Sequence, residues 1–141
     1  MTKRSSDPIG LKLTRVSRRV SRAFDAALAE VGGSLPLWLV LLSLKGNQHA
    51  AQRDLAESIG IEGATLTHHL NRMEEEGLIT RRRTPENRRV QLVSLTDKGE
   101  ELFRTLLTRV ITWDRQLRAG LSDAELDALR GLLDRLDANS S

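Results

Sequence analysis

Apolar residues recur at intervals of three and four along most of the chain, a spacing that is typical of amphipathic helices. The first such stretch follows Pro8, carries apolar positions from Ile9 to Val31 and ends at two glycines. A second begins at Ser34-Leu-Pro36, since proline is tolerated in a first helical turn. Residues 37–44 of this second stretch offer little polar surface, so we expect the helix to be buried.

Two further helical patterns follow Thr96, a suitable N-cap residue whose neighbour Asp97 favours a helix start. One runs to Gly120, and the other opens on Ser122-Asp-Ala-Glu125, which has the form of a capping box. The first helix and these last two carry long apolar stripes. A single small domain cannot cover three such stripes, so we expect these helices to pack against the same helices of a second copy.

The middle of the chain holds two short helical patterns joined by a glycine. The first places Leu55 and Ile59 on one face, and the second places Leu66, Leu70 and Met73 on one face. Gly60 between them suits a tight turn, because it adopts positive φ without a Cβ clash. This spacing predicts a helix-turn-helix.

The second of these helices presents a small, polar outward face. With its apolar residues inward, a step of 100° per residue directs the other side chains outward or to the flanks. Short hydrogen-bonding groups without acids suit entry into the DNA major groove, and acidic residues come only at its end, from Glu74 to Glu76. The candidate DNA-reading residues of this helix are Ala64, Thr65, Thr67, His68, Asn71 and Arg72.

A β-hairpin rich in arginine follows directly. Runs of strand-forming residues, 78–83 and 90–95, flank the turn Thr84-Pro-Glu-Asn87. Five clustered guanidinium groups repel one another unless a polyanion is the partner. The candidate DNA-binding residues of this wing are Arg81, Arg82, Arg83, Asn87, Arg88 and Arg89.

The stretch from Gln52 to Gly99 resembles the winged helix-turn-helix of the MarR family of bacterial transcription regulators. The matching motifs are Asp54-Leu-Ala, Thr65-Leu-Thr-His-His-Leu-Asn-Arg-Met-Glu-Glu-Glu-Gly-Leu, Asn87-Arg-Arg and Ser94-Leu-Thr-Asp-Lys-Gly. The family's wing tip usually carries Asp-x-Arg, with the Arg in the minor groove. Here Asn87 stands at the Asp position and Arg89 at the Arg position, so the side chain that would hold Arg89 is uncharged.

The resemblance implies a single mainly α domain over residues 1–141 with a small β-hairpin wing. A DNA-binding lobe would span residues 34–95, and residues 8–33 and 96–138 would form a helical homodimerisation base. Two recognition helices related by a two-fold axis imply an inverted-repeat operator in double-stranded DNA. Repression is the commoner outcome in the family.

The resemblance also implies a small-molecule effector, which in the family binds between the dimer base and the DNA-reading lobe. The four aromatic residues of the chain form the candidate effector pocket: Phe24, Trp38, Phe103 and Trp113. The alternative interpretation is that each of them packs in the core or the dimer interface. The identity of the effector is not encoded in any pattern of the sequence.

Composition narrows the remaining classes. The 141 residues suffice for one domain, and the absence of cysteine excludes a disulfide scaffold, a thiolate zinc site and a cysteine redox switch. From Thr96 onward nine acidic residues outnumber seven basic ones, so the net charge of +3 arises from the N-terminal helix and the wing. No apolar run reaches the roughly 20 residues that span a bilayer, so we expect a cytoplasmic protein without membrane contact.

Other functions are weaker interpretations of the same residues. The sequence lacks a phosphate-binding glycine loop or a recognisable catalytic constellation, so we expect neither catalysis nor a cofactor. His68 and His69 diverge by 100° on a helix, so we expect no metal site. A protein-interaction module has no need of the clustered arginines, and a sequence-blind architectural DNA binder has little use for Thr and Asn on the recognition helix.

Overall fold

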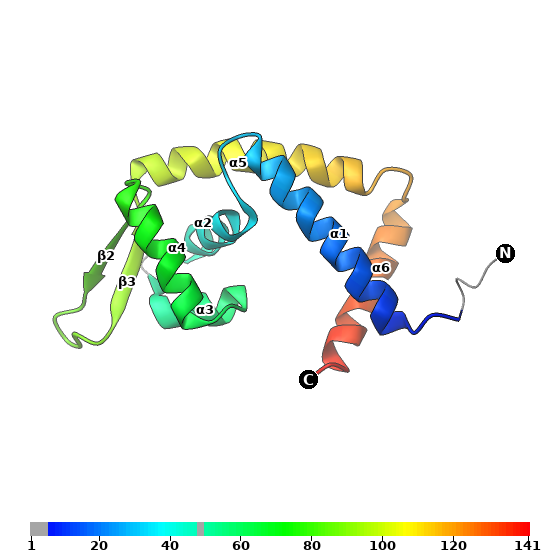
Figure 1. Cartoon of the computed structure of the whole chain (residues 1–141), viewed down its shortest axis with the longest axis horizontal. Coiled ribbons are helices and arrows are strands. Elements are labelled where there is room, and N and C mark those ends of the chain that lie inside the picture. The colour runs from blue at the N-terminus through cyan, green and yellow to red at the C-terminus, as the bar shows by residue number, and fades with distance from the viewer. Residues whose placement is uncertain (1–5, 48–49) are drawn as a thin grey trace. The chain divides into compact units, whose positions relative to one another are not determined.

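The structure is a computed structural model that describes residues 6–47 and 50–141. It divides into two compact units, residues 1–110 and residues 111–141. The first unit contains α1 (Ile9–Ala29), α2 (Leu35–Gly46), a winged helix-turn-helix and most of α5 (Asp97–Leu117) (Figure 1). The second contains the end of α5 and α6 (Asp123–Ala138). The fold is thus mainly helical with a small sheet, as the sequence predicts.

The two N-terminal helices begin and end where the sequence signals lie. After α1, Gly32 takes φ +85°, and the backbone N–H of Gly33 donates to the carbonyl of Leu28 at 2.9 Å. The Ser34 hydroxyl then caps α2 by accepting from the Leu37 N–H at 3.2 Å. The expectation that α2 is buried throughout is wrong at Leu42, which is 46% exposed, because one side of the helix faces away from the core.

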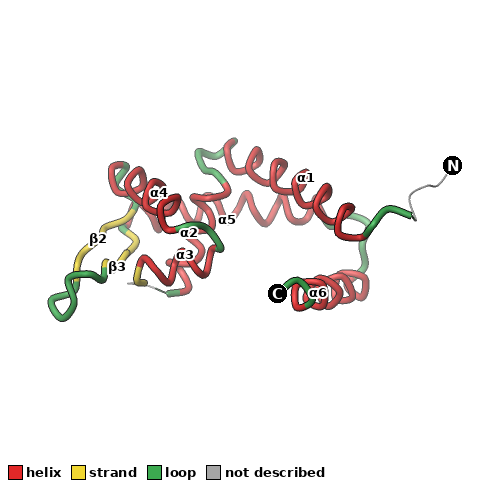
Figure 2. Tube along the Cα trace, turned by 60° about the horizontal axis from the view of Figure 1, so that its bottom comes forward, coloured by secondary structure: helices red, strands yellow, loops and turns green. Residues whose placement is uncertain are grey.

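The helix-turn-helix consists of α3 (Gln52–Ile59) and α4 (Gly63–Glu75), seen in Figure 2 beside the sheet. Gly60 ends α3 in the left-handed conformation, with φ +79°. The buried residues of α4 are Leu66, Leu70 and Met73, which confirms the predicted inward face. The remaining face of α4 is therefore available to a partner.

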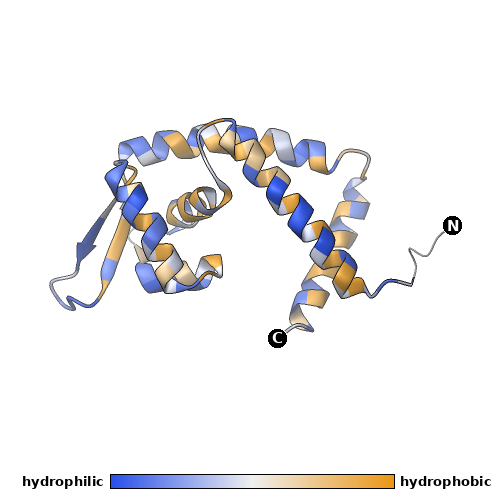
Figure 3. Cartoon of the chain, in the orientation of Figure 1, coloured by the Kyte–Doolittle hydropathy of each residue, from blue (hydrophilic) through white to orange (hydrophobic). Residues whose placement is uncertain are grey.

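The wing is part of a three-stranded antiparallel sheet with strand order β1-β3-β2. Strands β2 (Ile79–Arg83) and β3 (Gln91–Leu95) form the predicted hairpin, and β2 is the more hydrophilic of the two in Figure 3. The sequence does not predict β1 (Ala50–Ala51), which pairs with β3 through Ala50 and Val93. A two-residue strand is too short to carry an alternating pattern.

The junction between the sheet and α5 is tightly built. The Thr96 hydroxyl donates to the Gly77 carbonyl at 2.6 Å and accepts from the Gly99 N–H at 3.1 Å, which confirms Thr96 as the helix-starting residue. The Lys98 ammonium donates to the carbonyl of Glu76 at 2.7 Å, at the end of α4. These bonds tie the recognition helix, the wing and α5 together.

One hydrophobic core joins α2, α3, α4, the sheet and the first half of α5, with Leu41, Leu44, Leu66, Leu70 and Leu106 fully buried.

The second unit differs from the first in its burial. The capping box at Ser122 and Glu125 is present as predicted, yet α6 has no buried residue. No helix in the described ranges has the length and apolar character needed to cross a membrane.

Candidate nucleic-acid interface

The predicted reading face of α4 is largely solvent-accessible. Ala64, Thr65, His68, Asn71 and Arg72 are exposed, and Thr67 is half-buried. Helix α4 also contacts β2 and α3, so the reading face is held by neighbouring elements. Side chains on a fixed helix lose less conformational entropy when they bind, which favours a recognition role.

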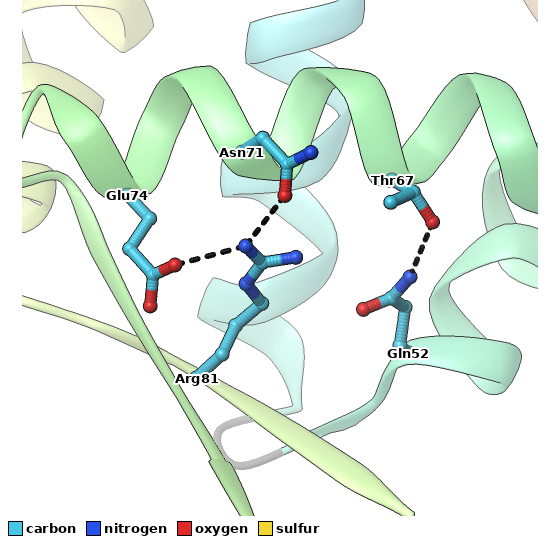
Figure 4. Close-up of polar contacts among 5 residues, drawn as sticks. All are labelled: Gln52, Thr67, Asn71, Glu74 and Arg81. Carbon is cyan, nitrogen blue, oxygen red and sulfur yellow. Dashed lines mark hydrogen bonds and ion pairs between the residues drawn. The ribbon is translucent and has the colours of Figure 1, made fainter.

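Thr67 is held in place by a side chain of α3. Its hydroxyl donates to the Gly63 carbonyl at 2.9 Å, and the Gln52 Nε2 donates to the same hydroxyl at 2.8 Å. Figure 4 shows Gln52 reaching from the start of α3 to Thr67. Sequence reasoning missed Gln52, because no helical spacing links two residues on different helices.

The tip of the wing is braced by its own hydrogen bonds. The Arg83 Nη1 donates to the Arg88 carbonyl at 2.6 Å, and the Thr84 hydroxyl donates to the Asn87 carbonyl at 2.7 Å. The Asn87 Oδ1 accepts from the backbone N–H of Arg89 at 3.1 Å. Asn87 therefore positions the backbone of Arg89 and leaves its guanidinium group unbound.

The five wing arginines, which the sequence presents as one set, fall into distinct environments. Arg82, Arg88 and Arg89 are exposed, and among the described residues their side chains have no hydrogen-bond or ion-pair partner. Arg81 is different, because its side chain is only 13% exposed. Its guanidinium group lies against α4 and is unavailable as a simple phosphate contact.

Arg81 bridges two residues of the recognition helix. Its Nη2 donates to the Asn71 Oδ1 at 2.6 Å and to the Glu74 Oε1 at 2.8 Å (Figure 4). The sequence contains a signal for this orientation: side chains alternate along a strand, so Arg81 lies on the same face of β2 as buried Ile79. Neither the ion pair nor the contact with Asn71 follows from the count of arginines alone.

An open groove of about 1170 Å³ separates the wing from the helix-turn-helix. Gly63 and Thr67 of α4 line one part of it, and Arg83, Asn87 and Arg89 line the wing side. The start of the recognition helix and the arginines of the wing therefore face one shared space.

The charges in this groove are unevenly distributed. The wing side contributes Arg83 and Arg89, whereas the side formed by α3 and the turn contributes Arg53 together with three acids. Those acids are Asp54, Glu57 and Glu62. A polyanion is therefore attracted toward the wing, while the acids disfavour deep occupation of the opposite wall.

The adjacent histidines occupy different environments. Their ring centroids lie 5.9 Å apart, and the ring planes are tilted by 57°. Burial, and then the nearby His68 and Arg72, lower the pKa of His69. Within the described part of the chain, no group of three or more His, Cys, Asp or Glu side chains is placed to hold a metal ion.

The aromatic residues of the candidate effector pocket are distributed between both units. Trp38 and Phe103 stack with ring centroids 5.2 Å apart and planes 7° apart, and they are only 4% and 6% exposed. Phe24 packs against the same core, and Trp113 is half-buried in the second unit. The stacked pair has little surface to offer a ligand in this conformation, so interior packing accounts for its burial.

A smaller hollow of about 200 Å³ lies beside α4 in the first unit. It is lined by the turn between α1 and α2 and by His69, Arg72, Met73 and Glu76 of α4. The four aromatic residues named above do not line it. Arg72 therefore belongs both to the lining of this hollow and to the candidate DNA-reading residues.

Comparison with known proteins places these features in context. Residues 34–90 match the model of the MarR family. The chain is 34% identical over 89 residues to the uncharacterised HTH-type transcriptional regulator YdgJ of Bacillus subtilis, an alignment that covers 63% of this chain. The chain spans 54% of the length of that relative.

Solved structures resemble nearly the whole chain. A probable transcriptional regulator from Pseudomonas aeruginosa is 30% identical with a TM-score of 0.83, covering 93% of this chain and 98% of that one. The repressor CouR bound to a 23-mer DNA duplex is 29% identical with a TM-score of 0.88, covering 97% of both chains. CouR from Rhodococcus jostii RHA1 bound to p-coumaroyl-CoA is 26% identical with a TM-score of 0.81, covering 96% and 95%.

Proposed function

The chain belongs to the MarR family, and we propose that it is a transcriptional regulator that binds a specific site in double-stranded DNA. The observation that carries this proposal is the shared groove, in which Thr67 of the recognition helix faces Arg83 and Arg89 of the wing. The DNA-bound structure of CouR supports the same use of the fold.

In this proposal the recognition helix enters the major groove and the wing follows the adjacent backbone. Ala64, Thr65, His68 and Arg72 are exposed on α4 and would meet bases or phosphates there. Arg89 at the wing tip would enter the minor groove, where a narrow groove attracts arginine. Arg82 and Arg88 would neutralise phosphates and supply affinity rather than sequence selection.

We propose a homodimer on an inverted-repeat operator, acting as a repressor. The support is the set of large apolar side chains left exposed on the helices expected to form the base. Ile9, Leu13 and Val16 of α1 and Leu129, Leu132 and Leu133 of α6 are all exposed in the single chain, Leu132 at 53%. Apolar surface on this scale marks an interaction site, and a two-fold dimer would place its recognition helices roughly 34 Å apart.

A small-molecule effector is a further part of the proposal, supported by the ligand-bound structure of CouR. Binding of a ligand would weaken the DNA complex by favouring a different spacing of the two recognition helices. The chain contains two tryptophans, so Trp113→Phe leaves Trp38 as the single indole reporter for ligand titrations. A ligand that lowers DNA affinity without changing the Trp38 signal would place the effector site away from α2.

The test of DNA binding is fluorescence anisotropy with the upstream intergenic DNA of the protein's own gene, at several salt concentrations and with random-sequence competitor. We expect saturable binding that survives competitor and weakens as salt rises. Arg89→Ala should lower the affinity on the order of tenfold to a hundredfold, since a groove-bound arginine contributes roughly 1–3 kcal/mol.

The matched control for Arg89→Ala is Arg104→Ala, an exposed arginine of α5 that does not line the groove. It should bind DNA like the wild type. Binding that disappears entirely with random competitor would favour the architectural alternative. Absence of binding even at low salt would contradict the DNA-binding proposal and favour a protein-interaction module.

A further inference from the structure

The contact between Arg81 and Asn71 determines which edge of the Asn71 amide faces outward. An arginine side chain carries only hydrogen-bond donors, so the atom 2.6 Å from Arg81 Nη2 must be the amide oxygen of Asn71. The amide nitrogen consequently points away from Arg81, as the close-up in Figure 4 shows. Asn71 is exposed, so the group that it offers to solvent is a donor.

Arg81 is itself held firmly enough to impose this orientation. Glu74, one helical turn after Asn71, accepts from the same nitrogen at 2.8 Å and forms an ion pair with it. The backbone of Arg81 lies in β2, paired with fully buried Val93 of β3. Its side chain therefore reaches α4 from a fixed strand, on the face of the sheet that packs inward.

Thr67 is restricted in the same way by Gln52. The hydroxyl hydrogen of Thr67 is used in its bond to the Gly63 carbonyl, and one lone pair accepts from Gln52. Thr67 thus has no donor left for a base. What it can still offer is its second lone pair, as an acceptor, and its methyl group, which suits the methyl of thymine.

We propose that Arg81 is a specificity-determining positioning residue, which presents Asn71 to DNA as a donor and so selects guanine at the base pair that Asn71 meets. This inference rests on the proposed function. Guanine displays two acceptors, N7 and O6, in the major groove, whereas bidentate reading of adenine requires the amide oxygen as well as the nitrogen of Asn71. In this protein that oxygen is directed toward Arg81, away from the amide nitrogen that Asn71 offers to solvent.

The test compares DNA sequences enriched from a random duplex library by the full-length wild type, Asn71→Ala and Arg81→Met. The base pair at which Asn71→Ala loses its preference identifies the position of Asn71. We expect guanine there in the wild type, and at least a threefold shift toward adenine in Arg81→Met, which keeps the aliphatic stem but frees the Asn71 oxygen. Adenine in the wild type, or an unchanged preference in Arg81→Met, would overturn the proposal.

The matched control is Arg82→Met, because Arg82 is the exposed neighbour on the same strand. It should lower affinity for all sequences alike and enrich the same sites as the wild type. A shift toward adenine in this control would mean that charge rather than orientation sets the preference, and would also overturn the proposal. Arg81→Leu, which likewise has no hydrogen-bond donor, replaces the methionine variant in this test if that variant does not fold.

A measurement without DNA separates this inference from the proposed function. In the free protein, the side-chain amide resonances of Asn71, assigned from their loss in Asn71→Ala, should move in Arg81→Met and stay in place in Arg82→Met. Unmoved resonances in Arg81→Met would overturn the orienting contact whatever the protein does with DNA. If the resonances move in Arg81→Met but the wild type enriches no DNA sequence, the orienting contact is present and the proposed DNA-binding function is wrong.

Discussion

Gly99, in the first turn of α5, lies directly against the backbone carbonyl of Leu78, the residue that precedes β2. A Cβ at position 99 would collide with that carbonyl oxygen, which also accepts a hydrogen bond from the Thr96 N–H at 3.1 Å. The junction between the wing and α5 therefore depends on a residue without a side chain.

Gly99→Ala should destabilise the protein by about 3 kcal/mol, at the upper end of what overpacking costs, because backbone on both sides must move. Urea unfolding monitored by circular dichroism measures the loss. The control is Gly46→Ala, since an added Cβ at that helical position meets no atom within 4 Å. The control should be neutral or slightly stabilising, and equal losses in both variants would show that the junction tolerates a methyl group.

The proposed dimer predicts the effect of charge on the apolar face of α6. Leu133→Glu should convert the protein from a species of twice 15.8 kDa into a monomer, because an ionised carboxylate is costly to bury without a partner. Light scattering coupled to size exclusion measures the mass. Arg130→Glu places the same charge on an exposed polar position of α6 and should leave the dimer intact. A wild type that is already monomeric would refute the dimer.

The lowered pKa of His69 predicts that the folded protein loses stability in mild acid. Burial lowers its pKa in the folded protein, so as pH falls below the ordinary value of about 6.5 the unfolded chain takes up a proton before the folded chain does. The free energy of unfolding should therefore decrease from pH 6.5 down to the lowered folded pKa and receive no further contribution below it.

Urea midpoints at pH 7.5 and pH 5.5 test this contribution. His69→Gln should show a smaller loss between the two pH values than the wild type. His68→Gln should also reduce the loss, because His68 is the second cause of the lowered pKa of His69. An identical loss in the wild type and His69→Gln would assign the pH dependence to other groups.

Replacing Arg82 should change the salt dependence of DNA binding. It is exposed on the outward face of β2, so its contact with DNA should be to phosphate. Arg82→Ala should reduce the slope of log affinity against log salt by about 0.9 per lost phosphate contact, or roughly 2 for a dimer. Asn71→Ala should leave the slope unchanged, because base contacts release few counterions. An unaltered slope in Arg82→Ala would remove Arg82 from the phosphate contacts.

The elements of this fold could be predicted from local patterns. The spacing of Leu66, Leu70 and Met73 defines the inward face of α4, and Ser122 with Glu125 marks the start of α6. Gly60 and Gly77 both adopt the positive φ that ends a helix. Each of these signals operates within one or two helical turns, so the residues needed to interpret it are adjacent in sequence.

The contacts that join distant elements could not be predicted in the same way. Stacking of Trp38 on Phe103 joins α2 to α5 and turns two candidate pocket residues into core. Strand β1 exists only because β3 offers it a partner. In both cases the energy comes from surfaces that meet after folding, and sequence spacing does not report which surfaces meet.

The wing shows most clearly the difference between what local sequence patterns predict and what contacts between distant elements decide. The sequence by itself determined a helix-turn-helix followed by an arginine-rich hairpin, because periodicity, turn residues and charge are local properties. Strand alternation places Arg81 on the face of Ile79, but only the tertiary structure decided that this face meets Asn71 and Glu74 while Arg82 stays exposed. The reason is that the partners of a strand residue depend on the pairing of β2 with β3 and on the helix that covers that face.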